Sequence, residues 1–208
     1  MGELITISER NVKPKGAKKG SIPHQEELKR FFFREELRRL ELLKAVTPFP
    51  NDRIQILYPG CGSDILTILL YLESLFPQAQ EAHCLFIDVY NNVGLIKTIL
   101  DEIGIPFSAH KNNLEFYWGN LRVELEFKTG NIFKLLPSLD AVDVYFERAF
   151  RIMKDDHKDY EQMVMKKLIS GGVLISDSGF ENMNLQRIKC SAKLSTYNEM
   201  IIAINSPY

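Results

Sequence analysis

Cysteine is scarce in this sequence of 208 residues, which holds only Cys61, Cys84 and Cys190. The three lie far apart, match no zinc-binding spacing, and leave one thiol over in any disulfide pairing. This excludes a disulfide-rich secreted scaffold and favours a reducing, cytoplasmic location. No metal site is predicted.

Long apolar runs and an excess of charge are absent as well. No apolar run approaches the ~20 residues of a membrane helix, and the N-terminus lacks the basic and apolar tandem of a secretion signal. The 26 basic residues nearly balance the 27 acidic ones, so the overall charge attracts neither DNA nor an anionic membrane. We therefore expect a small-molecule substrate, no nucleic acid and no membrane, while the oligomeric state stays open.

The length and the 45% of hydrophobic residues allow one buried core. The first 53 residues differ in charge, with 12 Lys or Arg against 8 Asp or Glu. Apolar residues recur at three- and four-residue steps over 24–46, which predicts an amphipathic helix that Pro48 ends. We expect residues 1–53 to form a basic segment with an accessory helix, and residues 54–208 to form the main domain.

The order of apolar runs after residue 53 predicts alternating strands and helices. A strand, a glycine turn and a helix are expected over 54–76, followed by a strand at 84–88 and a helix at 93–103. This βαβ order requires a parallel sheet. Alternating apolar residues over 114–127 then predict a hairpin with a two-residue turn.

The last third of the chain predicts further elements of the same sheet. A strand is expected at 141–146, a helix at 156–169, and a strand at 173–176. Two closing strands follow near 185–194 and 199–204. Such an all-β ending is expected when an antiparallel strand is added to a parallel sheet.

The segment LYPGCGSD at 57–64 is the sharpest local feature. Gly60 and Gly62 have no Cβ, so the backbone there can approach a ligand, and the next helix offers free N–H groups at its positive end. Asp88 ends the following strand, where an acid can accept hydrogen bonds from a ribose diol. Taken alone, Asp88 can also cap the next helix, and Asn131 can be a turn residue.

These residues resemble the class I S-adenosylmethionine-dependent methyltransferases, whose first strand ends in an acid followed by Gly-x-Gly-x-Gly. Gly60 and Gly62 match the first two glycines, with Cys61 between them. Asp88 matches the ribose-binding acid of the family. Asn131 matches a position at which a polar side chain contacts adenine.

Two positions depart from the family pattern, because Tyr58 replaces the acid and Asp64 replaces the third glycine. Asp64 is a candidate for the missing acid. Glu147 and Arg148, after the strand at 143–146, fall where the family places residues that face the sulfonium and the substrate. Over 54–205 the resemblance implies a Rossmann-like α/β fold with a seven-stranded, mostly parallel sheet, one antiparallel strand near the C-terminus, and helices on both faces.

The resemblance implies methyl transfer from the cofactor S-adenosylmethionine to a small-molecule acceptor. The protein would then supply alignment, exclusion of water, and a base where the nucleophile is protonated. Candidate bases are Glu147, Asp177 and His157. The alternative is a non-catalytic Rossmann-like domain that binds a nucleoside or a protein and has lost activity, which Tyr58 and Asp64 favour.

Other nucleotide-binding classes fit less well. A dinucleotide dehydrogenase needs a third glycine where this chain has Ile65, and no Gly-Lys-Ser/Thr follows the turn as in a P-loop. An aminopropyl transferase would share the fold, but its acidic cluster for a polyamine is not evident. The sequence also lacks the motifs of amino-group and cytosine C5 methylation, which leaves a small molecule as the expected acceptor.

Overall fold

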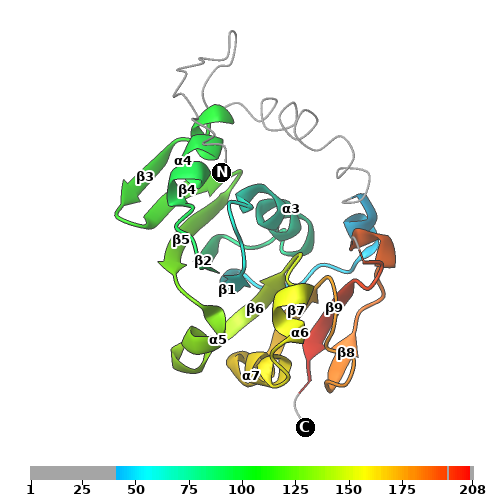
Figure 1. Cartoon of the computed structure of the whole chain (residues 1–208). Helices are drawn as coiled ribbons and strands as arrows, with labels where there is room; N and C mark the ends of the chain where they lie inside the picture. Colours follow the sequence, from blue (N-terminus) through cyan, green and yellow to red (C-terminus); the bar gives the residue numbers. More distant parts are fainter. Residues whose placement is uncertain (1–40, 196, 207–208) are drawn as a thin grey trace.

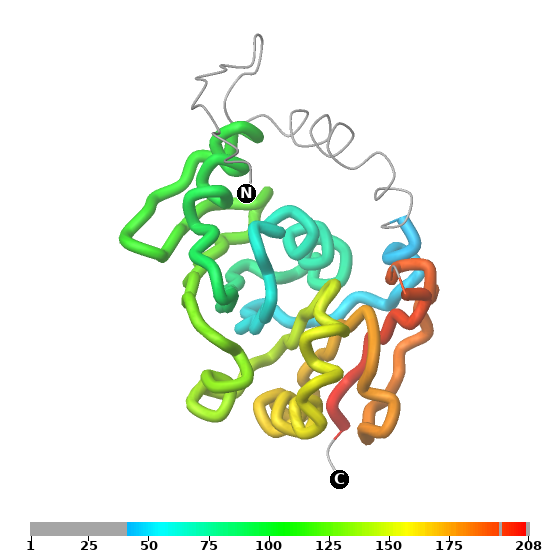
Figure 2. Tube along the Cα trace, viewed as in Figure 1, coloured from blue at the N-terminus to red at the C-terminus, as the bar shows by residue number. Residues whose placement is uncertain are grey.

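The computed structural model describes residues 41–195 and 197–206, so most of the predicted accessory helix lies outside the described residues. The description begins with a short 3-10 helix, η1 (Glu41–Ala45). Figure 2 shows this blue segment beside the red-orange η3 (Ala192–Leu194), and Leu43 and Leu194 share one hydrophobic core. The division of the chain at residue 53 stays a prediction.

One sheet of nine strands organises the described chain, in the order β3-β4-β5-β2-β1-β6-β7-β9-β8. The strands are β1 (Arg53–Pro59), β2 (Glu81–Asp88), β3 (Phe107–His110), β4 (Asn113–Trp118), β5 (Leu121–Thr129), β6 (Val142–Glu147), β7 (Leu168–Ser176), β8 (Leu185–Arg187) and β9 (Ile201–Asn205). β1 lies between β2 and β6, and the run from β5 to β7 is parallel throughout. Their carboxyl ends therefore meet along one side, called here the carboxyl edge (Figure 1).

The prediction of a mostly parallel α/β sheet is confirmed, but its seven strands with one antiparallel member are wrong, because the sheet has nine. The predicted hairpin forms β4 and β5 as an antiparallel pair, and β3 adds to β4 at the sheet edge. β9 pairs antiparallel with β7, as expected near the C-terminus. β3 escaped prediction because its four residues, largely exposed, carry no apolar alternation.

Helices cover both faces of the sheet, as predicted. On one face lie α3 (Ile65–Leu75) and α4 (Val93–Glu102), and on the other α5 (Ile132–Leu135) and α7 (Tyr160–Lys167) (Figure 1). Successive strand residues point to opposite faces, so Ile56 joins the core under α3 while Leu57 joins the core under α7. Nearly every residue of α3 is buried, in keeping with its apolar sequence.

Two element boundaries differ from the prediction. The helix expected over 156–169 is the shorter α7, since β7 already begins at Leu168, which pairs with Val142. The short helix α6 (Arg151–Asp155) precedes it and was not predicted. The strand expected over 185–194 is only β8, which pairs with β9 through residues 185–187. The 3-10 helix η2 (Leu136–Ser138) follows α5. Within 41–195 and 197–206, no helix is long and apolar enough to cross a membrane.

Candidate functional site

The glycine turn after β1 is fastened to the end of β2. Gly60 and Gly62 have φ of +60° and +54°, in the left-handed region that favours glycine. The Gly60 N–H donates to the Ile87 carbonyl at 2.8 Å, and the Gly62 N–H donates to Asp88 Oδ2 at 2.9 Å. Cys61 between them is buried, and burial raises the pKa of its thiol, which therefore stays protonated.

Asp88 accepts backbone hydrogen bonds through both carboxylate oxygens. Oδ2 accepts from Gly62, and Oδ1 accepts from the Tyr90 N–H at 3.1 Å. α4 begins only at Val93, so the carboxylate holds the two loops rather than the first turn of that helix. Since a carboxylate has about four acceptor positions, it can still accept hydrogen bonds from a ligand.

The two residues that depart from the family pattern are bonded to each other. The buried Tyr58 hydroxyl donates to Asp64 Oδ2 at 2.9 Å, while Asp64 Oδ1 caps α3 by accepting the Thr67 N–H at 3.2 Å. Phe86 and Phe146 hold the Tyr58 ring edge to face. Burial first, and then Asp64, raise the pKa of Tyr58, so the tyrosine is neutral and Asp64 brings the negative charge.

Arg148 adds a cation at the same helix start. Its Nη1 donates to Thr67 Oγ1 at 2.8 Å and lies 3.7 Å from Asp64 Oδ2. The sequence placed Arg148 on the ligand side of the sheet but did not indicate its contacts, because these partners lie more than eighty residues earlier. A charged residue directly after a parallel strand was the one signal available.

Asn131 and His157 lie at the start of α5 and before α7. The Asn131 side chain caps α5 by accepting the Phe133 N–H at 2.9 Å. The Gly130 N–H donates to the Asp88 carbonyl at 2.8 Å, which keeps this turn beside the end of β2. The exposed His157 ring stacks on Phe133 with 3.6 Å between ring centroids.

Glu147, a predicted base and cofactor contact, is fully buried at the end of β6. Its carboxylate pairs with Lys154 and accepts hydrogen bonds from Tyr145 and Ser176, each at 2.5 Å. Burial raises the pKa of Glu147, and the Lys154 ammonium opposes that rise. The pair lies within the core of the described residues.

Asp177, another predicted base, follows β7 and fixes the loop after β6. Its Oδ2 accepts the Ala149 N–H at 2.7 Å, and Ala149 has a φ of +53°. Its Oδ1 is buried and has no partner among the described residues. Burial raises the pKa of Asp177 above its usual value, and the bond from Ala149 counteracts this.

Phe150 covers the glycine turn from the second core. A Cβ added at Gly60 would overlap the Phe150 ring, whereas one at Gly62 would meet nothing within 4 Å. The Phe150 ring also stacks on Phe133, with centroids 5.8 Å apart. The close approach that Gly60 permits is thus made by Phe150.

The structure joins most of the predicted residues into one group. The joined residues are Tyr58, Gly60, Cys61, Gly62, Asp64 and Asp88. Glu147 is buried with Lys154, and Asp177 holds the loop that carries Arg148 through the N–H of Ala149. Asn131 and His157 both contact Phe133. Among the described residues, no cluster of three His, Cys, Asp or Glu could hold a metal ion.

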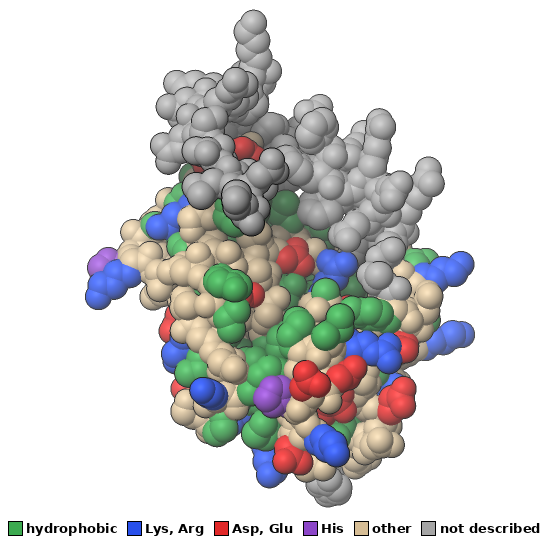
Figure 3. Space-filling view, viewed as in Figure 1, with side chains coloured by type: hydrophobic (Ala, Val, Ile, Leu, Met, Phe, Trp, Pro, Cys, Tyr) green, Lys and Arg blue, Asp and Glu red, His purple; other side chains and the backbone are tan. Residues whose placement is uncertain are grey.

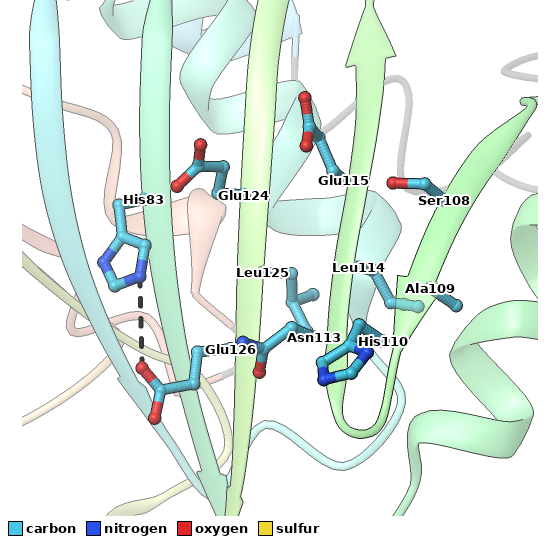
Figure 4. Close-up of a pocket in the computed structure, with 10 residues that line it drawn as sticks. All are labelled: His83, Ser108, Ala109, His110, Asn113, Leu114, Glu115, Glu124, Leu125 and Glu126. Carbon is cyan, nitrogen blue, oxygen red and sulfur yellow. Dashed lines mark ion pairs between the residues drawn. The ribbon is translucent and has the colours of Figure 1, made fainter.

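Two hollows lie away from the carboxyl edge. One, of about 330 Å³, opens on the sheet face over β2 to β5, lined by polar residues that include His83, Glu124 and Glu126 (Figure 4). The other, of about 260 Å³, lies at the amino ends of β1 and β2, near Arg53 and Glu81. No predicted site residue lines either hollow.

Exposed apolar side chains border the carboxyl edge. Val89 and Tyr90 directly follow Asp88, and Ile152 and Met153 belong to α6. Tyr90 and Ile152 are each 74% exposed. Figure 3 shows hydrophobic side chains gathered over α6 on this face, with acidic side chains beside them. Exposed apolar groups next to a polar site are suited to contact a ligand.

Comparisons with known proteins find similarity of structure. No family model and no curated protein matches the chain. MNMC2 from Aquifex aeolicus is similar at a TM-score of 0.46 and 13% identity, over 86% of this chain and 62% of that one. Precorrin-6y C5,15-methyltransferase from Geobacter metallireducens is similar at a TM-score of 0.38 and 16% identity, over 68% of this chain and 59% of that one.

PKMT2 from Rickettsia typhi, solved in complex with AdoHcy, is similar at a TM-score of 0.40 and 17% identity, over 68% of this chain and 24% of that one. The chain spans about three fifths of the length of the two structures described before it.

Alanine substitution should distinguish the two glycines. Both Gly60→Ala and Gly62→Ala incur about 1–2 kcal/mol from the left-handed backbone. Gly60→Ala should lower the free energy of unfolding further, because its Cβ overlaps the Phe150 ring. Combining Gly60→Ala with Phe150→Ala should remove this additional loss. Urea denaturation compares the parent, the two single glycine variants and the double variant. Equal losses for the two glycines would contradict the Phe150 contact.

Removing the cation of the buried pair should destabilise the fold. Lys154→Met leaves the Glu147 carboxylate without its counter-charge, which should cost about 3–5 kcal/mol of unfolding free energy. Adding Glu147→Gln should restore part of that loss. The exposed Lys158→Met serves as the matched control and should change little. A single Lys154→Met protein as stable as the parent would mean that Glu147 is neutral when folded.

Proposed function

We propose that this chain binds S-adenosylmethionine at the carboxyl edge and transfers its methyl group to a small-molecule acceptor. The observation that carries the proposal is the hydrogen bond from the Gly62 N–H to Asp88. It unites in one site the glycine turn, where a Cβ at Gly62 would meet nothing within 4 Å, and an acid suited to a ribose diol.

The neighbouring residues suit the remaining parts of the cofactor. The ribose would contact Asp88, and adenine would lie toward Asn131, whose turn is bonded to the end of β2. The amino-acid end would lie along the glycine turn toward Asp64, which has the charge that Tyr58 does not provide. Gly60, Cys61 and Gly62 would contribute backbone contacts.

The proposed chemistry asks mainly for alignment. The cofactor supplies a methyl group already activated on sulfur, and the chain orients the acceptor and excludes water. The apolar side chains of Val89, Tyr90 and Ile152 favour an acceptor with an apolar surface. Where a proton must be removed, Asp177 and His157 are the remaining candidates, because Glu147 is paired within the core.

A second candidate function keeps nucleoside binding without catalysis. It is favoured by the burial of Glu147 and Asp177, which takes two of the three predicted bases away from solvent. An acceptor screen separates the two functions.

Isothermal calorimetry tests the binding step directly. The full chain is titrated with S-adenosylmethionine and S-adenosylhomocysteine, with NAD and ATP as controls. Binding of the two adenosyl sulfur compounds alone supports the proposal and leads to the acceptor screen. Tighter binding of NAD, or no binding of any of the four, would overturn it.

Replacing the ribose acid should weaken the nucleoside. Asp88→Ala removes hydrogen bonds to a charged acceptor, each about 1.5–3 kcal/mol, which should raise the Kd for S-adenosylhomocysteine roughly 10- to 100-fold. Asp143→Ala is the matched control, since Asp143 also accepts a backbone N–H, from Gln55 toward the amino end of the sheet. Its Kd should not change. Equal affinity of Asp88→Ala and the parent would remove Asp88 from the site.

A further inference from the structure

Two successive residues after β7 hold polar atoms that have no partner. Within residues 41–195 and 197–206, Asp177 Oδ1 and Ser178 Oγ are the only buried side-chain nitrogen or oxygen atoms without a hydrogen bond. The two residues are only 4% and 1% exposed. A buried polar atom left unpaired costs about 1–3 kcal/mol, and native structures contain few of them. Two such atoms in adjacent residues point to a polar ligand.

The backbone that follows these two atoms is strained. Gly179 and Phe180 have φ of +79° and +57°, and a residue as bulky as Phe180 rarely adopts a left-handed conformation. The Phe180 N–H donates to Glu161 Oε1 at 2.9 Å, and its carbonyl accepts from Arg187 Nη2 at 3.2 Å. Backbone strain that the surroundings maintain in this way is typical of segments that bind a ligand.

The two atoms stand at the carboxyl edge, on the strand next to β6. Glu147 and Ser176 are register partners at the ends of β6 and β7, so Asp177 follows directly at this edge. Asp177 Oδ2 accepts the Ala149 N–H at 2.7 Å, which leaves Oδ1 for a ligand. β7 is two strands from β1 (Figure 1), roughly 10 Å at ~4.8 Å per strand. A cofactor at the glycine turn after β1 and a small molecule at Asp177 would thus be neighbours.

We propose that Asp177 and Ser178 bind a hydroxyl group of the methyl acceptor, so that the chain methylates oxygen on a small hydroxyl compound. This inference rests on the proposed function. A hydroxyl has one proton and two lone pairs, so it can donate to Asp177 Oδ1 and accept from Ser178 Oγ. Because both atoms are shielded from solvent, binding requires residues 177–180 to move.

Other polar groups match these two atoms less well. A carboxylate has no proton to donate to Asp177. An ammonium has no lone pair with which to accept from Ser178, and it would add a positive charge beside Lys154, which already donates to the Ser178 carbonyl. A neutral hydroxyl satisfies both atoms and adds no charge.

The transfer step balances with these residues. The acceptor oxygen forms a bond to the methyl carbon, and the carbon–sulfur bond breaks with its electron pair left on sulfur. The hydroxyl proton passes to Asp177 Oδ1. The products are a methyl ether, S-adenosylhomocysteine and protonated Asp177. Burial raises the pKa of Asp177, which suits a carboxylate that must take up a proton.

The preference for a hydroxyl is tested with small probes on the full chain saturated with S-adenosylhomocysteine. Three series of compounds, built on benzyl, cyclohexyl and butyl groups, each carry a hydroxyl, an ammonium, a carboxylate or a methyl group. Nuclear magnetic resonance follows the amide signals of residues 177–179. In at least one series the hydroxyl member should shift these signals with a Kd at least tenfold lower than that of the other members.

The probe experiment separates this inference from the proposed function. If S-adenosylhomocysteine binds and the hydroxyl probes are no better than their methyl or ammonium counterparts, the hydroxyl site is overturned and the cofactor site stands. If S-adenosylhomocysteine itself does not bind, the proposed function is overturned as well.

Substitution then assigns the preference to the two residues. Asp177→Asn keeps an oxygen for the Ala149 N–H but replaces the other oxygen by an N–H donor, so the Kd of the hydroxyl probe should rise at least tenfold. Ser178→Ala should raise it by a smaller factor, because a hydrogen bond between neutral groups is weaker. The matched control is Asp143→Asn, since Asp143 Oδ2 also accepts a backbone N–H, from Gln55.

The substitutions can contradict the assignment in two ways. An unchanged Kd of the hydroxyl probe in both Asp177→Asn and Ser178→Ala would place the probe elsewhere. An equal loss in Asp143→Asn would mean that the overall charge of the sheet is responsible. If Asp177→Asn fails to fold, Ser178→Ala and the comparison of probes on the parent chain still decide the question.

Discussion

The carboxylate of Asp88 accepts the N–H of Gly62, and this bond fixes the geometry of the carboxyl edge. β1 and β2 are parallel neighbours, so the loops that follow them leave the sheet side by side. Gly62 has a left-handed backbone conformation, and its N–H points to the carboxylate at the end of β2. Hydrogen bonds therefore connect the turn, the acid and the start of α3.

Patterns that repeat along the chain made most of the fold predictable. The alternation in residues 121–127 sets one burial face for β5, and the glycine and proline positions mark where α3 begins and ends. β3 could not be predicted, since its sheet position comes from pairing with β4 and not from its own residues. The early start of β7 was also missed, because Leu168 continues an apolar helical pattern while its pairing with Val142 makes it a strand.

The site was predictable where its contacts are local. Gly60, Gly62 and Asp88 stand in a motif or at a strand end, so the sequence alone indicates them. Arg148 was expected on the ligand side, but its bond to Thr67 could not be predicted, because Thr67 comes from a distant part of the chain. The surroundings of Glu147 were likewise unpredictable. Its carboxylate pairs with Lys154 and accepts a hydrogen bond from Ser176, which comes from the neighbouring strand.

Asp177 repeats on the other half of the sheet what Asp88 does on the first. β2 and β7 each lie one strand outward from the central pair of β1 and β6, and each is followed or ended by an aspartate. Each aspartate accepts an N–H from the loop after the inner strand, near a residue with positive φ. The two loops bring Asp64 and Arg148 together at α3. Because both anchors are carboxylate bonds to backbone, the site's charges are oriented in advance, which lowers the reorganisation that ligand binding requires.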